Sequence, residues 1–114
     1  DKKYVYYVTQ SYYPRLLAAG VRIYEYTPGF VHAKMYVSDD KEATVGSANM
    51  DYRSLYLHFE NCCAFYGGHM VRDVRDDVRA ALAESREVTL EDVARTPFFK
   101  WLAQVFLRFF SPLM

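Results

Sequence analysis

Two short runs of β-forming residues on either side of a polar turn constrain the fold of this chain most strongly. Residues 33–38 are predicted to form one strand, and residues 43–46 are a short apolar run rich in β-formers. The four residues between them, Asp39-Asp40-Lys41-Glu42, have the polar character of a turn. The sequence therefore predicts a hairpin, which folds the second strand back beside the first.

Polar residues occupy regular positions on and around this hairpin. The period of two along a strand places His32 and Lys34 on the same face, where they can share one anion. Asp39 falls at the strand end, where it is better placed to hold the turn than to contact a substrate. The residues alone leave a catalytic and a purely structural role open for Asp39. The whole pattern is His-x-Lys-x4-Asp-x6-Gly-Ser-x-Asn, formed by His32, Lys34, Asp39, Gly46, Ser47 and Asn49.

The second strand of the hairpin ends in residues that suit a phosphate group. Gly46 allows the backbone to come close to a ligand. Ser47 and Asn49 can offer side-chain hydrogen bonds to phosphate oxygens, and Lys34 supplies the positive charge. These residue types therefore predict a site for a phosphate-bearing substrate.

An acidic residue eleven positions after Asn49 completes the set. Residues 57–66 are predicted to form a third strand, on which His58, Glu60 and Cys62 share a face. Glu60 could then hold a ring nitrogen of a histidine and fix its tautomer. Each polar residue taken singly is more often structural, but seven fixed positions coincide here. The coincidence favours a catalytic site.

The segments that flank the pattern carry a further likeness, at residues 20–26, 28–34 and 43–54. Together with the pattern, they resemble the C-terminal catalytic half of bacterial cardiolipin synthase, a member of the phospholipase D superfamily. The likeness continues through Phe59-Glu60 to Leu113 and so covers nearly the whole chain. One departure is His58, which stands where the family is expected to have Asn.

This resemblance implies a fold, a reaction and a cellular location. The fold is an α/β domain with a mixed β-sheet flanked by helices. The reaction condenses two phosphatidylglycerol molecules into cardiolipin without a cofactor, at the bacterial cell membrane, on its cytoplasmic side. One histidine forms a phosphatidyl-histidine, and the resemblance gives His32 the other role, that of the general acid and base. The implied residues are His32, Lys34 and Asp39 for catalysis, Lys34, Ser47 and Asn49 for the phosphate, and Glu60 for orienting a histidine.

Members of this superfamily are similar in needing two copies of the pattern that face each other. No second His-x-Lys pair occurs in the 114 residues, because Glu60 follows His58 and Val71 follows His69 at that spacing. We therefore expect the C-terminal half of a longer synthase, soluble or peripheral and inactive by itself. Its partner would be an N-terminal half or a second copy of the chain. A phospholipase D or nuclease, and a noncatalytic interaction domain with a vestigial pattern, are the alternative interpretations.

The composition gives no indication of a nucleic-acid partner or of a metal site. The formal net charge is +0, whereas a nucleic-acid binder usually carries a basic field, so no nucleic-acid partner is predicted. Cys62 and Cys63 are predicted to be reduced, buried small hydrophobes, and no metal site is suggested. No apolar run approaches the roughly 18 residues of a membrane span.

Helices are predicted on both sides of the hairpin. From the residues alone, Ser11 caps a helix that runs to Ala19, whereas the resemblance implies a start near Lys3. Thr89 with Asp92 forms a capping box that opens a short helix. Between them, a helix that covers the sheet is predicted from four apolar residues at helical spacing: Val71, Val74, Val78 and Leu82.

Residues 96–114 are predicted to be a separate amphipathic helix that follows the catalytic half at residues 1–95. Thr96 is the predicted N-cap and Pro97 the first helical residue. The helix packs on the domain or on the absent half, or it lies in a membrane interface beside Trp101. Its polar side carries Lys100, Gln104 and Arg108, and its apolar side carries Phe98, Leu102, Val105, Phe106, Phe109 and Phe110.

Overall fold

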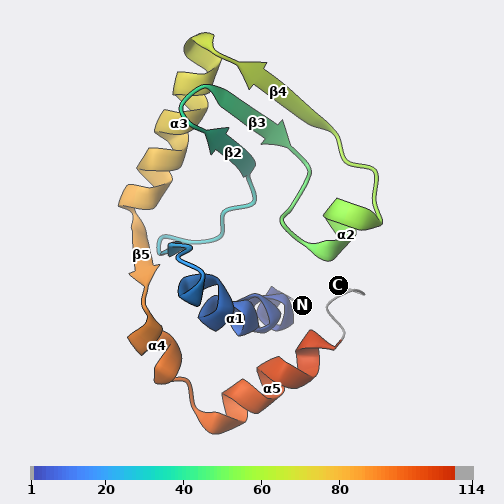
Figure 1. Cartoon of the computed structure of the whole chain (residues 1–114), viewed down its shortest axis with the longest axis vertical. Helices are drawn as coiled ribbons and strands as arrows, with labels where there is room; N and C mark the ends of the chain where they lie inside the picture. Colours follow the sequence, from blue (N-terminus) through green and yellow to red (C-terminus); the bar gives the residue numbers. More distant parts are fainter. Residues whose placement is uncertain (1, 110–114) are drawn as a thin grey trace. The chain divides into compact units, whose positions relative to one another are not determined.

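The computed structural model describes residues 2–109. The chain divides into two compact units: Tyr26–Arg86 forms one, and the segments before and after it form the other. The strands belong to two small sheets, and helices accompany them (Figure 1). The predicted α/β class, with helices flanking β-structure, is therefore confirmed.

The unit at Tyr26–Arg86 contains the predicted hairpin. Strands β2 (Lys34–Ser38), β3 (Glu42–Gly46) and β4 (Cys62–Tyr66) form an antiparallel sheet in the order β2-β3-β4. The register pairs Lys34 with Gly46 at one end of the hairpin and Ser38 with Glu42 beside the turn. The hairpin therefore lies where the sequence predicted it.

Helix α3 (Gly68–Ala83) covers one face of this sheet (Figure 1). Val71 is only 1% exposed and packs with Val74 and Ala43 at the centre of the core. Four partly buried side chains from the strands surround them: Met35, Val37, Val45 and Phe65. Because side chains alternate along a strand, Lys34 and Tyr36 point to the opposite face. The prediction from helical spacing holds for Val71 and Val74, whereas Leu82 near the helix end is 40% exposed.

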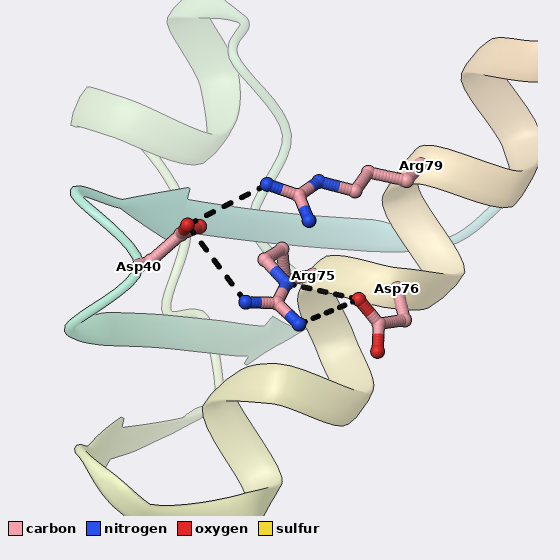
Figure 2. Close-up of polar contacts among 4 residues, drawn as sticks. All are labelled: Asp40, Arg75, Asp76 and Arg79. Carbon is pink, nitrogen blue, oxygen red and sulfur yellow. Dashed lines mark hydrogen bonds and ion pairs between the residues drawn. The ribbon is translucent and has the colours of Figure 1, made fainter.

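The hairpin turn is tied to α3 by charge. Asp39 and Asp40 have φ angles of +52° and +55°, a left-handed conformation that Asp tolerates. The Asp40 carboxylate lies 3.8 Å from Arg75 and 3.5 Å from Arg79 (Figure 2). Arg75 also pairs with Asp76 at 2.9 Å, and this hydrogen bond holds the pKa of Asp76 below its ordinary value. Asp40 thus fixes the turn on the helix.

A short helix replaces part of the predicted third strand. Helix α2 (Tyr52–Tyr56) begins at Asp51, whose side chain accepts a hydrogen bond of 2.7 Å from the Ser54 N–H. The backbone N–H groups of Leu57 and His58 then both donate to the Arg53 carbonyl. Because those groups complete the helix end, they cannot enter a β-ladder. The predicted strand over residues 57–66 is therefore wrong up to residue 61.

Two further strands and helix α4 lie close, along the sequence, to the residues at which the chain passes from one unit to the other. β1 (Ile23–Tyr26) pairs with β5 (Ser85–Val88), a strand that sequence reasoning missed. Helix α4 (Leu90–Ala94) begins with the predicted capping box: the Thr89 N–H donates to the Asp92 carboxylate at 2.9 Å, and the Asp92 N–H donates back to the Thr89 hydroxyl. The capping-box prediction is confirmed.

Helix α1 (Lys2–Ala18) starts where the resemblance implied and not at the predicted cap. Ser11 lies inside the helix, where its hydroxyl donates to the Val8 carbonyl at 2.6 Å. A serine that bonds backward in this way is satisfied within a helix and does not start one. The Ser11 cap prediction is therefore wrong.

Helix α5 (Phe98–Arg108) packs against α1 through its polar side. Lys100 lies 5.5 Å from the centre of the Tyr7 ring, and Arg108 lies 4.4 Å from that of Tyr12. Gln104 is 6% exposed and donates to the Gln10 side chain at 3.3 Å. The amphipathic pattern is as predicted, with Pro97 in place of Thr96 as the N-cap; the predicted positions Phe110 and Leu113 lie outside the described residues.

The aromatic side of α5 is left exposed. Phe99 is 82% and Phe109 is 83% exposed. A helix that packs through cations on aromatic rings reverses the usual arrangement, in which the apolar stripe faces the protein. Across residues 2–109, no helix is both long and apolar enough to cross a membrane.

Candidate active site

His32 and Lys34 meet at the start of β2. Lys34 is the first residue of β2, whereas His32 lies two residues before it, outside the strand. The Lys34 ammonium is 2.5 Å from Nδ1 of His32 and donates to the His32 carbonyl at 2.8 Å. The ring of Phe30 flanks His32, with 5.8 Å between the ring centres. A cation and an imidazole therefore share one exposed position.

Because an ammonium group can only donate, the His32 nitrogen that faces Lys34 acts as an acceptor. The same ammonium lies 3.4 Å from Nε2 of the ring, so Lys34 is near both ring nitrogens. A phosphate bound here would draw the Lys34 protons to its own oxygens. This geometry suits a histidine that exchanges a proton beside an anion.

Ser47 joins the two loops that flank the end of β3 and the start of β4. Its N–H donates to the Asn61 carbonyl, and its hydroxyl oxygen accepts from the Asn61 N–H, both at 3.0 Å. The hydroxyl donates to Glu60 at 2.5 Å. Hydrogen bonds from Ser47 and Ser54 hold the pKa of Glu60 below its ordinary value, so this carboxylate is charged at neutral pH.

This arrangement changes the expectation for two residues. A serine has one hydroxyl hydrogen, and Ser47 donates it to Glu60. The predicted hydrogen bond from Ser47 to a phosphate therefore requires the hydroxyl to rotate away from Glu60. Glu60 lies before β4 and not on a strand with His58 and Cys62. The contact that Glu60 makes here is with Ser47, and its role in orienting a histidine remains a prediction.

Gly46 lies where the neighbouring strand comes close to β3. A side chain at this position would place its Cβ 2.6 Å from the Cα of Cys62 and in contact with the Asn61 carbonyl. The glycine therefore lets the backbone of β4 approach β3, which brings Asn61 onto Ser47. The structure shows close approach of the neighbouring strand, and the predicted approach of a ligand at Gly46 stays a prediction.

Asn49 lies exposed in the loop between β3 and α2. The loop is held just before it, because the Tyr36 hydroxyl donates to the Ala48 carbonyl at 2.8 Å. Burial raises the pKa of Tyr36, which keeps its proton available for this bond. Sequence reasoning missed Tyr36, although its position two residues after Lys34 places it on the same face of β2.

Asp39 lies far from the other predicted catalytic residues along the hairpin. It is in the turn beside Ser38, whereas Lys34 is paired with Gly46 at the opposite end of the two strands. The structure thus brings His32 together with Lys34, and Ser47 together with Glu60, but leaves Asp39 in the turn. A catalytic role for Asp39 remains an untested prediction.

The cysteines occupy the edge strand and are exposed. Cys62 and Cys63 are free thiols on β4, which has a neighbour on one side only. The predicted burial of both residues is therefore wrong. Among residues 2–109, no cluster of three or more His, Cys, Asp or Glu side chains could hold a metal ion.

The chain is similar to known proteins over its whole length. The relatives include cardiolipin synthase 2 of Bacillus anthracis, 38% identical over 114 residues, and the cardiolipin synthase of Geobacillus kaustophilus, 42% identical over 118. An uncharacterized protein of Streptococcus mutans is 41% identical over 114 residues. These alignments cover 100% of this chain but only 22%, 23% and 25% of the three relatives.

No solved structure matches the chain. The family profile for the phospholipase D-like domain of cardiolipin synthase matches residues 1–82. That match includes the His32–Lys34 pair, the Ser47–Glu60 contact and most of α3. The chain belongs to the phospholipase D-like family of cardiolipin synthase domains.

Proposed function

We propose that this chain supplies one half of a phosphatidyltransferase site that makes cardiolipin from two phosphatidylglycerol molecules. The observation that carries the proposal is the contact between Lys34 and His32, a cation and a proton carrier at one exposed position. Family membership supports the same chemistry, since two of the relatives named above are cardiolipin synthases. No cofactor is required by the proposed reaction.

The mechanism has two transfer steps. A histidine of the other half attacks the phosphorus of the first phosphatidylglycerol, and the bond to glycerol breaks while His32 donates a proton to the leaving oxygen. His32 then accepts a proton from a hydroxyl of the second phosphatidylglycerol. That oxygen attacks the phosphatidyl-histidine, which releases the first histidine and yields cardiolipin.

Electrostatic stabilisation would come from the groups around the transferred phosphate. Lys34 carries the charge, and Asn49 offers amide hydrogens from the exposed loop. Ser47 would join them once its hydroxyl turns from Glu60, which could then hold a histidine ring. Each role is a proposal for the complete, two-half site.

In our proposal, the second catalytic histidine comes from outside this chain. The chain contains one His-x-Lys pair, and it spans about a quarter of the relatives' length or less. An N-terminal half of the same parent protein would carry the other copy of the pattern. A second copy of this chain is the alternative partner.

Product analysis tests the proposal. The chain is incubated with labelled phosphatidylglycerol in detergent, alone and together with a half that carries the other pattern, and the lipids are separated by mass. We expect cardiolipin and glycerol from the complete site, and none from the monomeric chain. Lys34→Gln in the complete site should reduce the product rate by roughly 100-fold or more.

The other outcomes identify the alternatives. Phosphatidic acid without cardiolipin would identify a phospholipase D that transfers the phosphatidyl group to water. No lipid turnover by the complete site would indicate a vestigial pattern in a noncatalytic domain. Turnover by the isolated chain that rises steeply with its concentration would identify pairing of two copies.

We further propose that α5 meets the membrane surface from which the lipid substrates come, on the cytoplasmic side of the bacterial cell. The support is the exposed aromatic side of the helix, since such side chains bind at the headgroup boundary. Lys100 and Arg108 lie over tyrosine rings of α1, so the aromatic side chains would make most of the contact.

Serine substitutions test this surface. Phe99→Ser with Phe109→Ser should lower partitioning of the chain into phosphatidylglycerol vesicles by roughly tenfold, because two exposed rings no longer enter the interface. Leu16→Ser, which removes an exposed apolar side chain from α1, is the matched control. Equal partitioning of all three proteins, measured by vesicle sedimentation, would contradict membrane contact by α5.

A further inference from the structure

Arg53 is held by an imidazole and not by a carboxylate. Its Nε lies 3.2 Å and one terminal nitrogen 2.8 Å from Nε2 of His58. In the same unit, Arg75 and Arg79 pair with aspartates. Within residues 2–109, Arg53 forms no ion pair with an acidic side chain. Its positive charge is therefore held in place without being cancelled.

The backbone around Arg53 fixes the same geometry. The Arg53 carbonyl accepts from the N–H groups of Leu57 and His58, at 2.9 Å each. The turn that closes α2 therefore brings His58 back to both the backbone and the side chain of Arg53. Asp51 fixes the other end of this short helix through its bond to Ser54. Both ends of the element that carries the guanidinium are thus held.

This pair lies next to the candidate active site. Glu60 accepts from Ser47, and it also interacts with Ser54 and with His58. Ser54 is the neighbour of Arg53 in the chain, and His58 is its side-chain partner. Glu60 therefore links the motif residue Ser47 to Ser54 and to the charge of His58, the two residues beside the guanidinium of Arg53.

The proposed reaction includes a second anionic group that suits a cation at such a position. The acceptor phosphatidylglycerol carries a phosphodiester that does not react, and in the product one glycerol joins this phosphate to the transferred one. Lys34 and Asn49 serve the transferred phosphate. A guanidinium presents parallel N–H groups that fit two phosphate oxygens, and Arg53 keeps donors beyond those used on His58.

We propose that Arg53 binds the non-reacting phosphate of the acceptor lipid, and that His58 positions the guanidinium for it. This inference rests on the proposed phosphatidyltransferase function. It adds a binding site for a second phosphodiester to the site at His32 and Lys34. It also assigns a purpose to His58, the residue at which this chain departs from the pattern expected of the family.

Two acceptors separate this role from a structural one. In the complete two-half site, cardiolipin formation uses the anionic acceptor phosphatidylglycerol. Exchange of labelled glycerol into phosphatidylglycerol uses the same donor with an uncharged acceptor. Arg53→Gln should lower kcat/KM for the anionic acceptor roughly 10- to 100-fold, which is the contribution of a charge-assisted hydrogen bond. The glycerol exchange rate should change by less than about twofold.

Matched variants complete the experiment. Arg72→Gln removes the same charge from an exposed position on α3 and should leave both reactions unchanged. Arg53→Lys keeps the charge without the planar fork, and should restore part of the anionic-acceptor activity. His58→Ala should raise KM for phosphatidylglycerol as acceptor while kcat is retained, and it should add nothing in the Arg53→Gln background.

Each result has one meaning. Equal losses in both reactions for Arg53→Gln and Arg53→Lys would overturn the proposal and show that Arg53 supports the fold. Equal retention of both reactions in Arg53→Gln would overturn it as well. If the unsubstituted protein catalyses neither reaction, the proposed function itself has failed, which is a separate outcome.

Discussion

Replacing Gly46 by alanine should lower the free energy of unfolding by at least about 2 kcal/mol, the scale of an overpacked core position. The added Cβ would lie 2.6 Å from the Cα of Cys62 and would also meet the Asn61 carbonyl. Both obstacles belong to the backbone, so no side-chain rotation relieves them. β4 would have to move away from β3, and the contacts between Ser47 and Asn61 would break with it.

Denaturant unfolding of the chain measures this effect. Gly29→Ala is the matched control, because nothing lies within 4 Å of a Cβ built at Gly29 and its φ is not in the left-handed region. We expect a clearly lower midpoint for Gly46→Ala and nearly the original midpoint for Gly29→Ala. Coincident curves for the two variants would show that β3 and β4 are not packed as described.

The sequence predicted best where local chemistry decides the structure. The hairpin follows from two β-forming runs and a polar turn, and the capping box at Thr89 follows from two side chains three positions apart. Val71 and Val74 were identified by helical spacing because one helix face must cover the sheet. The contact of Lys34 with His32 follows from residues two positions apart at a strand start.

The misses occurred where local signals compete. Residues 57–61 look like the beginning of a strand, but Asp51 caps a helix just before them. The N–H groups of Leu57 and His58 then donate to the Arg53 carbonyl. Ser11 has the residue type of a helix cap, yet its hydroxyl is satisfied inside α1. The aspartate cap at Asp51, followed by Ser54, was a readable signal for α2.

Other misses depend on parts of the chain that are distant in sequence. The amphipathic pattern of α5 gives its two sides, but only the tyrosine rings of α1 determine that the cationic side packs inward. The close contact of Gly46 with β4 likewise depends on where β4 lies. The partner of Glu60 could not be chosen from spacing, because Ser47 reaches it across the β3–β4 pair.

His32→Ala should lower cardiolipin formation by the complete two-half site about 10²- to 10⁴-fold, the contribution of a positioned acid and base. Glycerol leaves as a basic alkoxide unless it receives a proton. A nucleophile, in contrast, is needed whatever the leaving group is. The loss on phosphatidylglycerol is therefore expected for either role of His32, and a second substrate must separate the roles.

A phosphatidyl ester of nitrophenol provides that substrate, because nitrophenol leaves without protonation. The decisive measurement is rapid mixing of the His32→Ala protein with this ester, followed by the absorbance of nitrophenol and the mass of the protein. If His32 is the acid and base, a burst of about one nitrophenol per site will appear, and the protein will gain a phosphatidyl group on the other half. If no burst appears while the unsubstituted protein reacts normally, His32 is the nucleophile and its proposed role is reversed.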